Sequence, residues 1–264
     1  MLRGDFKMNV VSMHRVPMPQ CQDCPISGLS FCASVSEESL GELSRLANRA
    51  NFKRGQTIMM QGDVSEKIGI LRSGVIKTVF MTEEGDTQVL GLLFPGDFVG
   101  RAFESDYRFS YEAATDTEVC VFNRVSFEAL LMGSPMLEHE YLLSSLRQMD
   151  MMHSWTCLLR GRTARERVAA YFMFSALYEG ETDTMLDMSG ANPVVNLRLC
   201  RADLASLLDM TPETFCRCLH GLADQGAVRV LNPNRIELTD MRRLRHLAGP
   251  PLEGLIEGPR LAVG

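Results

Sequence analysis

Turn signals recur between Phe52 and Gly100, mostly about 11 residues apart, and this spacing limits the possible fold more than any other feature of the chain. The apolar runs between the turns are long enough for β-strands but too short for helices of several turns. The five signals are Lys53-Arg54-Gly55, Gln61-Gly62-Asp63, Ser73-Gly74, Glu84-Gly85-Asp86 and Pro95-Gly96-Asp97. Many short antiparallel strands joined by tight turns predict a barrel or sandwich of about 70 residues.

Helical periodicity returns at Val125 and dominates the stretch 135–160. One heptad seam of this helix contains Leu142, Met149, Met152, Thr156 and Leu159. A long helix with such a stripe between two domains typically forms a dimer. The alternative is that the stripe packs on the chain's own sheet. We expect a homodimer through the helix 135–160.

The segment 199–230 predicts two short helices separated by a tight turn. Asp209 suits a left-handed turn residue, Thr211 suits a helix N-cap, and Pro212 suits the first helical position. The N-terminal end of the second helix would then present its side chains as a DNA recognition helix does. Arg pairs bidentately with guanine, and Glu accepts from the cytosine amino group. The expected DNA contacts are Thr211, Glu213, Cys216 and Arg217.

A hairpin pattern follows these helices, because apolar runs at 226–230 and 235–238 flank Asn232-Pro233-Asn234. Such a hairpin is typical of the wing of a winged helix-turn-helix domain. The net charge of −6 supports DNA binding only weakly, although 160–248 is less acidic than the rest. The alternative is a plain helical hairpin with a solvated charged face. We expect a reader of double-stranded DNA over 161–248.

Three of the eight cysteines, Cys21, Cys24 and Cys32, lie within twelve residues. Clustered thiols in a reducing compartment favour metal binding or redox chemistry over structural disulfides. Soft sulfur ligands suit zinc or an iron–sulfur cluster. A fourth ligand must come from elsewhere. We favour Cys120, on an expected strand, over Cys157, which we expect to serve the packing of the long helix.

Other features narrow the class of protein. The apolar runs are too short for a membrane span, and no apolar stretch of a secretory signal follows the start. We therefore expect a cytoplasmic protein without membrane contact. No Ser/His/Asp arrangement, glycine-rich phosphate loop or acid–base pair is visible, so an enzyme is not expected. Residues 1–20 and 249–264 are expected to be a flexible extension and a flexible tail.

This order of elements resembles the cAMP receptor protein/FNR superfamily of transcription regulators over residues 21–248. The N-terminal cysteines resemble those of its FNR branch, the fumarate and nitrate reduction regulators. The motifs that carry the resemblance are Cys21-x2-Cys24-x7-Cys32, Arg72-Ser-Gly-Val-Ile-Lys77, Thr82-Glu-Glu-Gly-Asp86, Pro95-Gly-Asp-Phe-Val-Gly100, Ala164-Arg-Glu-Arg-Val-Ala169 and Glu213-Thr-Phe-Cys-Arg217.

The resemblance implies an α+β fold in three parts. An N-terminal antiparallel β-roll over 21–134, cupin-like or cyclic-nucleotide-binding-like, would be the sensory domain and would include the cysteine loop. The dimerisation helix would occupy 135–160, and the C-terminal winged helix-turn-helix 161–248.

The resemblance also implies a cofactor and partners. Cys21, Cys24, Cys32 and Cys120 would hold an oxygen-labile 4Fe–4S cluster, which oxygen converts to a 2Fe–2S form with weaker dimerisation and DNA binding. The dimer would bind a palindromic TTGAT-like operator and activate anaerobic or microaerobic genes. A loop of Thr82, Glu83, Glu84, Gly85 and Asp86 would contact RNA polymerase.

The chain departs from the family pattern at three positions. The family usually has Ser at Cys216 and Gly at Asp209, and its oxygen-sensing members place a carboxylate where this chain has Met152. An apolar seam at Met152 would tolerate a cluster-free dimer better than a carboxylate does. The departure at Cys216 predicts a modest difference in half-site preference.

Other signals on the same fold remain alternatives. The carboxylate and the Arg-Ser pair that bind cyclic nucleotides are missing, since the chain reads Gly100-Arg101-Ala102 and Tyr107-Arg108-Phe109 there. Cyclic AMP is therefore not expected. A regulator that answers haem, NO or thiol redox remains open, and so does a protein with a structural zinc site.

Overall fold

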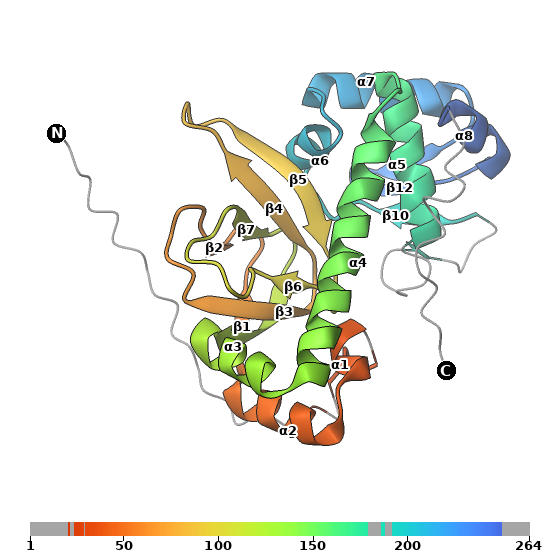
Figure 1. Cartoon of the computed structure of the whole chain (residues 1–264). Helices are drawn as coiled ribbons and strands as arrows, with labels where there is room; N and C mark the ends of the chain where they lie inside the picture. Colours follow the sequence, from red (N-terminus) through yellow and green to blue (C-terminus); the bar gives the residue numbers. More distant parts are fainter. Residues whose placement is uncertain (1–20, 22–23, 29, 179–185, 188–191, 250–264) are drawn as a thin grey trace.

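The computed structural model describes residues 21, 24–28, 30–178, 186–187 and 192–249. The extension expected over 1–20 and the tail from residue 250 onwards lie outside the described residues. Within them the chain has the expected α+β architecture: a β-rich part, a long helix beside it, and a helical part with a small sheet (Figure 1).

Two four-stranded antiparallel sheets form the β-rich part, with strand orders β1-β8-β3-β6 and β2-β7-β4-β5. The strands are β1 (Asn48–Phe52), β2 (Thr57–Met59), β3 (Lys67–Ser73), β4 (Ile76–Met81), β5 (Thr87–Leu93), β6 (Phe98–Val99), β7 (Ser110–Ala113) and β8 (Thr117–Asn123). Side chains from both sheets, such as Ile76, Leu71 and Val119, are fully buried together. The expected β-roll is confirmed.

The five expected turns each contain a glycine with positive φ, at Gly55, Gly62, Gly74, Gly85 and Gly96. Gly74 is the most constrained of them, with φ of 89°. A Cβ on Gly74 would lie 2.4 Å from the carbonyl oxygen of Asp116. A larger residue there would have to displace backbone, so this turn requires glycine.

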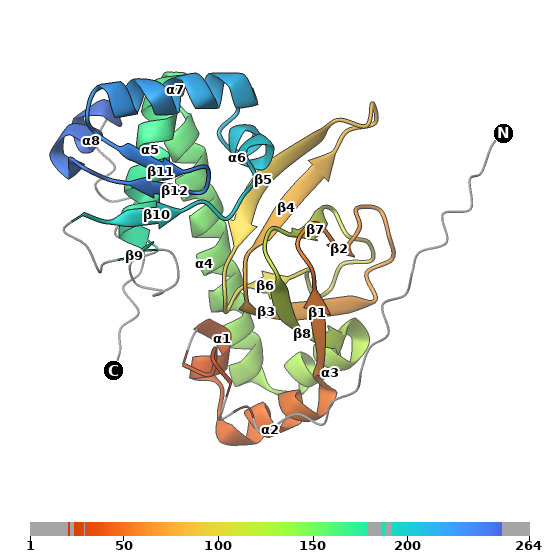
Figure 2. The same ribbon diagram turned by 180° about the vertical axis from the view of Figure 1, so that it is seen from behind.

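Three short helices cover one end of the β-roll: α1 (Ser30–Ser34), α2 (Glu37–Leu46) and α3 (Arg124–Gly133), seen at the bottom of Figure 1. The side chain of Ser36 caps α2 by accepting from the Ser39 N–H at 3.3 Å. The long helix α4 (Pro135–Leu159) starts beside them and runs along the β-roll to the C-terminal part (Figures 1 and 2). It therefore contacts both the β-roll and the C-terminal part.

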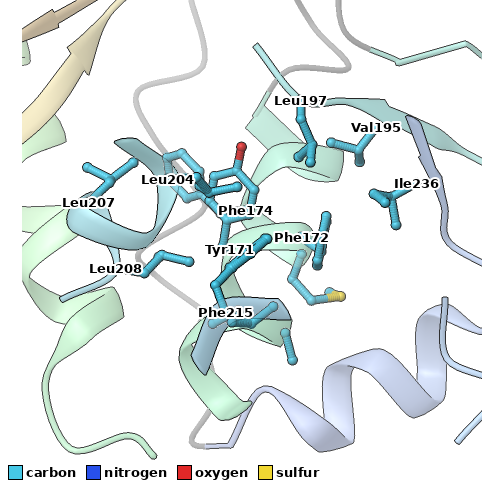
Figure 3. Close-up of a cluster of buried hydrophobic side chains, with 14 of the residues drawn as sticks. Tyr171, Phe172, Phe174, Val195, Leu197, Leu204, Leu207, Leu208, Phe215 and Ile236 are labelled. Carbon is cyan, nitrogen blue, oxygen red and sulfur yellow. The ribbon is translucent and has the colours of Figure 1, made fainter. Parts of the chain in front are cut away.

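The C-terminal part contains α5 (Ala164–Tyr178), α6 (Arg201–Leu207), α7 (Pro212–Asp224) and α8 (Met241–Leu247). Its core joins Tyr171, Phe172 and Phe174 of α5 to leucines of α6 and to Phe215 of α7 (Figure 3). The expected hairpin is present as β11 (Arg229–Asn232) and β12 (Arg235–Glu237).

The sequence analysis predicted no strand between α5 and α6, but the structure has β9 (Leu186–Asp187), which pairs with β10 (Val194–Asn196). The hairpin thus belongs to a four-stranded sheet of order β11-β12-β10-β9. Periodicity missed β9 because two residues cannot show an alternating pattern, and backbone pairing with β10 supplies the structure.

Candidate cysteine site and nucleic-acid interface

Cys21, Cys24, Cys32 and Cys120 line one pocket between the N-terminal loop, α1 and strand β8. The rest of the lining of this cysteine pocket is mostly apolar, with side chains such as Ile26, Leu43, Ile70 and Phe122. The fold brings them together because Ile26 and Phe31, near the cysteines in the chain, are fully buried against the β-roll. Cys120 of strand β8 thereby lines the same pocket as Cys21 and Cys24 of the loop and Cys32 of α1.

Burial dominates the chemistry of two of these thiols. It raises the pKa of Cys32 to about 12, with a further rise from the neighbouring Cys120, Cys24 and Cys21. It also raises the pKa of Cys120 to about 12, against an opposing effect of Arg72. All four cysteines are free thiols. Burial therefore disfavours the thiolate forms of Cys32 and Cys120, and a nearby positive charge would favour them.

The donor set fits an iron–sulfur group, because four soft sulfur atoms surround one enclosed and mostly apolar space. Among the described residues, no three His, Cys, Asp or Glu side chains converge on a single-ion position. The structure thus gathers the four predicted ligands around one pocket and does not collect them on one point.

An aromatic cluster connects the cysteine pocket to α4. It consists of Phe31, Phe98, Phe122, Phe127 and Tyr141. Phe31, next to Cys32, lies 5.1 Å from Phe98, and Phe98 lies 4.8 Å from Tyr141 of α4, both as edge-on ring pairs. The Gln148 side chain of α4 also donates to the Phe98 carbonyl at 3.0 Å. The cysteine loop is therefore joined to the long helix by a continuous series of side-chain contacts.

The helix-turn-helix geometry agrees with expectation. Asp209 adopts the left-handed conformation, with φ of 52°. The Thr211 hydroxyl caps α7 by accepting from the Thr214 N–H at 3.2 Å. Arg167 of α5 donates to the carbonyl oxygens of Leu208 and Asp209, each at 2.8 Å. These bonds hold the turn between α6 and α7 in the conformation that glycine usually provides.

The four expected DNA contacts differ in how far they face solvent. Thr211, Glu213 and Arg217 are exposed near the N-terminal end of α7, at the top of Figure 1. Cys216 is partly buried, and its sulfur lies 3.7 Å from the Arg201 guanidinium. Thr211, Glu213 and Arg217 thus form the accessible part of the expected DNA-contacting face.

Comparison with known proteins agrees with both halves of the structure. The cyclic nucleotide-binding domain family matches residues 49–134, and the Crp-like helix-turn-helix domain family matches residues 166–247. A probable transcriptional activator of Rhizobium leguminosarum bv. viciae is 32% identical over 228 residues, covering 86% of this chain and 92% of that protein. The chain is a member of the CRP/FNR family of transcription regulators.

Two further likenesses extend over most of this CRP/FNR regulator. The transcriptional activator protein FnrL of Cereibacter sphaeroides is 29% identical over 246 residues, covering 92% of this chain and 98% of FnrL. The structure of FixK2 from Bradyrhizobium japonicum covers 78% of this chain and 98% of FixK2, with a TM-score of 0.65 and 23% identity, and thus agrees in fold. The expectation of a DNA-binding regulator rather than an enzyme is thereby confirmed.

The predicted dimer seam of the regulator lies partly on the surface of a single chain. Leu142 and Met149 are 53% and 48% exposed, and Thr156 is exposed. Met152 is half-buried against Gly91 of β5, and Leu159 packs on the C-terminal core. Met152 and Leu159 therefore contact their own chain, as the alternative interpretation of the stripe expects.

Leu146, which was not expected in the seam, is 42% exposed on the same helix. We call Leu142, Leu146 and Met149 the dimer stripe, because these apolar side chains of α4 are exposed in the single chain and available to a second copy. The predicted heptad stripe did not include Leu146. The sequence alone does not show which side of α4 is covered by the chain's own sheet.

Thr82–Asp86 forms the projecting tip of the β4–β5 hairpin (Figures 1 and 2). The Thr82 N–H donates to the Asp86 carbonyl at 2.9 Å, and the Gly85 N–H donates to the Thr82 carbonyl at 3.1 Å. Glu83, Glu84 and Asp86 are exposed. The tip is therefore an acidic, solvent-exposed turn whose backbone is held by two internal hydrogen bonds.

The sequence analysis did not predict two buried polar contacts near the candidate sites. Arg72 donates to Cys24, and Lys77 forms an ion pair with Asp203 of α6. Both basic residues belong to the motif Arg72-Ser-Gly-Val-Ile-Lys77, which was used only to recognise the family. A cation in an otherwise apolar strand was the available signal, because such a residue needs a buried partner.

None of the helices in the described residues is long and apolar enough to cross a membrane.

Proposed function

We propose that this CRP/FNR regulator senses oxygen through a 4Fe–4S cluster held by Cys21, Cys24, Cys32 and Cys120. The observation that carries the proposal is the pocket that all four cysteines line, although they come from separate parts of the chain. When bound, the cluster supplies an oxygen-labile group whose presence depends on the redox state of the cell. The name of FnrL, given above, supports the same reading.

The protein's own residues connect this site to dimerisation. The cysteine ligands would hold the loop and α1 against β8, and the ring of Phe31 would then stay packed on Phe98 and Tyr141. Tyr141 directly precedes Leu142 of the dimer stripe. Loss of the ligand set would loosen the loop and remove this support from α4. We therefore propose that the bound state favours a homodimer through α4.

The dimer would place two α7 helices at the half-sites of a palindromic, TTGAT-like operator. Glu213 and Arg217 would contact base edges, while Thr211 would fix the start of the helix and Cys216 would pack below the reading face. The acidic tip Thr82–Asp86 would contact RNA polymerase. Activation of transcription under anaerobic or microaerobic conditions follows from these parts, and the names of both activator relatives support it.

The proposal is tested by measuring iron, acid-labile sulfide and the visible spectrum of protein purified without oxygen. About four iron and four sulfide per chain, with bleaching in air, would support it. Zinc in place of iron would replace it with a structural metal site. A metal-free protein that still binds the operator would replace it with a regulator of another signal.

DNA binding is measured on the same samples before and after exposure to air. A fall in operator affinity in step with bleaching is expected. An affinity that air does not change, despite a cluster that bleaches, would contradict the switch and leave the cluster assignment standing.

A further inference from the structure

Arg72 is a cation buried at the edge of the cysteine pocket. Its side chain is only 4% exposed on strand β3. The Nε–H donates to the Cys24 sulfur at 3.3 Å, and Nη1 donates to Glu118 Oε1 at 2.6 Å. The guanidinium therefore bridges a pocket thiol and a carboxylate on the neighbouring strand β8.

The bond to sulfur is informative because a neutral thiol is a weak acceptor. A buried guanidinium is normally satisfied by carboxylates or carbonyl oxygens, with which it forms strong charge-assisted bonds. Arg72 instead directs one N–H to Cys24. This donor becomes a strong, charge-assisted partner only when the Cys24 sulfur carries negative charge, as it does when it ligates a metal.

The charge balance around Arg72 leaves part of its positive charge available to the pocket. Glu118 is the carboxylate bonded to it, and Glu118 also lies 3.9 Å from Arg49. Two cations thus share one carboxylate, whose side chain is 25% exposed and partly screened by solvent. The net charge beside the cysteines is positive.

We propose that Arg72 is a positioning residue that orients Cys24 as a ligand and sets the reduction potential and air stability of the iron–sulfur group in the pocket. This inference rests on the function proposed above. Hydrogen bonds to ligand sulfur and nearby charge are among the protein's means of tuning such groups. A positive charge stabilises the state with the extra electron, so it raises the potential and slows the loss of an electron from the bound group to dioxygen.

The test compares Arg72→Gln with Glu118→Gln, which should act in opposite directions. Removing the guanidinium charge should lower the midpoint potential and make bleaching in air about tenfold faster, the effect of one charge-assisted hydrogen bond. Removing the carboxylate should leave Arg72 uncompensated, raise the potential and slow the bleaching. Arg72→Lys keeps the charge without the directed bond and should fall between wild type and Arg72→Gln.

Arg101→Gln is the matched control, because Arg101 pairs with Glu104 at 3.0 Å and does not line the cysteine pocket. It should leave both quantities unchanged. Iron and sulfide content is measured on every variant, so that a change in potential is compared between equally loaded proteins. If Arg72→Gln does not fold, the shifts of Arg72→Lys and Glu118→Gln decide the matter.

Equal potentials and bleaching rates in wild type and the Arg72 and Glu118 variants would overturn the role of Arg72 alone. A wild-type protein without iron and sulfide would overturn the proposed function, and this inference with it. The two failures are therefore separate observations.

Discussion

The Lys77 ammonium of β4 lies 2.8 Å from the Asp203 carboxylate of α6, and this ion pair joins the β2-β7-β4-β5 sheet to the helix-turn-helix. The same ammonium pairs with Glu112 of β7 at 3.0 Å. Beside it, the Val89 N–H of β5 donates to the Ser206 hydroxyl of α6 at 3.0 Å. The DNA-binding domain is thus attached directly to this sheet, in addition to its connection through α4.

We expect Lys77→Met to destabilise the protein by about 3 kcal/mol, because it leaves Glu112 and Asp203 facing each other without a cation. Asp203→Asn should cost only about 1 kcal/mol, because Lys77 keeps Glu112 as a partner. Urea denaturation measures both. Lys53→Met, at an exposed pair with Asp116, is the control and should not change the midpoint. Equal losses of stability in Lys77→Met and Asp203→Asn would show that Lys77, Glu112 and Asp203 do not act as a unit.

Cys24→Ser and Cys120→Ser should each abolish assembly of the iron–sulfur group while leaving the fold largely intact, because serine keeps the size but removes the soft ligand. The visible spectrum and the iron content measure assembly, and circular dichroism monitors the fold. Cys157→Ser, at an exposed position of α4, should retain a wild-type spectrum. A normal spectrum for either pocket variant would remove that cysteine from the ligand set.

Arg217→Ala should weaken binding to the operator by about 1–3 kcal/mol and relax discrimination at one position of the half-site, if Arg217 reads a base edge. Binding to specific and random duplexes at the same salt concentration measures the effect. Arg45→Ala, on exposed α2 at the opposite end of the molecule, serves as the control (Figure 1). Equal losses on both duplexes would assign Arg217 to the phosphate backbone.

Met149→Asp should dissociate the homodimer, because it would place one carboxylate from each protomer face to face in a low-dielectric seam between the two α4 helices. The monomer should still fold, since Met149 is 48% exposed in the single chain. Sedimentation measures the association. Val125→Asp, at a 64% exposed position of α3, should sediment as wild type. Unaltered sedimentation of Met149→Asp would place the interface on another surface. Met152→Asp should also weaken a cluster-free dimer, but it disturbs the contact with Gly91 as well.

Asp97 gives the protein a pH-dependent stability. Burial raises the pKa of this carboxyl to about 7, against the opposing effects of the Phe94 N–H and of Arg147 on α4. The folded state therefore binds a proton that the unfolded state releases near pH 4. This contribution is complete below pH 4 and is lost as the pH rises through 7.

Asp97→Asn should remove that part of the pH dependence, since an amide does not titrate. Urea unfolding of both proteins between pH 4 and 8 measures it, and the difference between them should change steadily across this range. A difference that stays constant with pH would show that Asp97 titrates normally in the folded protein.

The elements that the sequence predicted well are those with a local physical cause. Turn glycines, the Thr211 cap and the left-handed Asp209 depend on a few neighbouring residues, so their sequence pattern was sufficient. Strand β9 was missed because its cause is pairing with β10, which no local pattern reveals. The exposure of Leu146 was not foreseen for a similar reason, because it depends on the sheet that lies beside α4.

By itself, the sequence determined the order of the domains and the positions of the turns, because both depend on residue type and spacing. Only the tertiary structure decided that the four cysteines share one pocket, that Arg72 faces Cys24 and that Lys77 holds Asp203. These contacts join residues far apart in the chain. Packing of the sheets and helices determines which of them form, because a buried charge or thiol is stable only beside the partner that the fold brings to it.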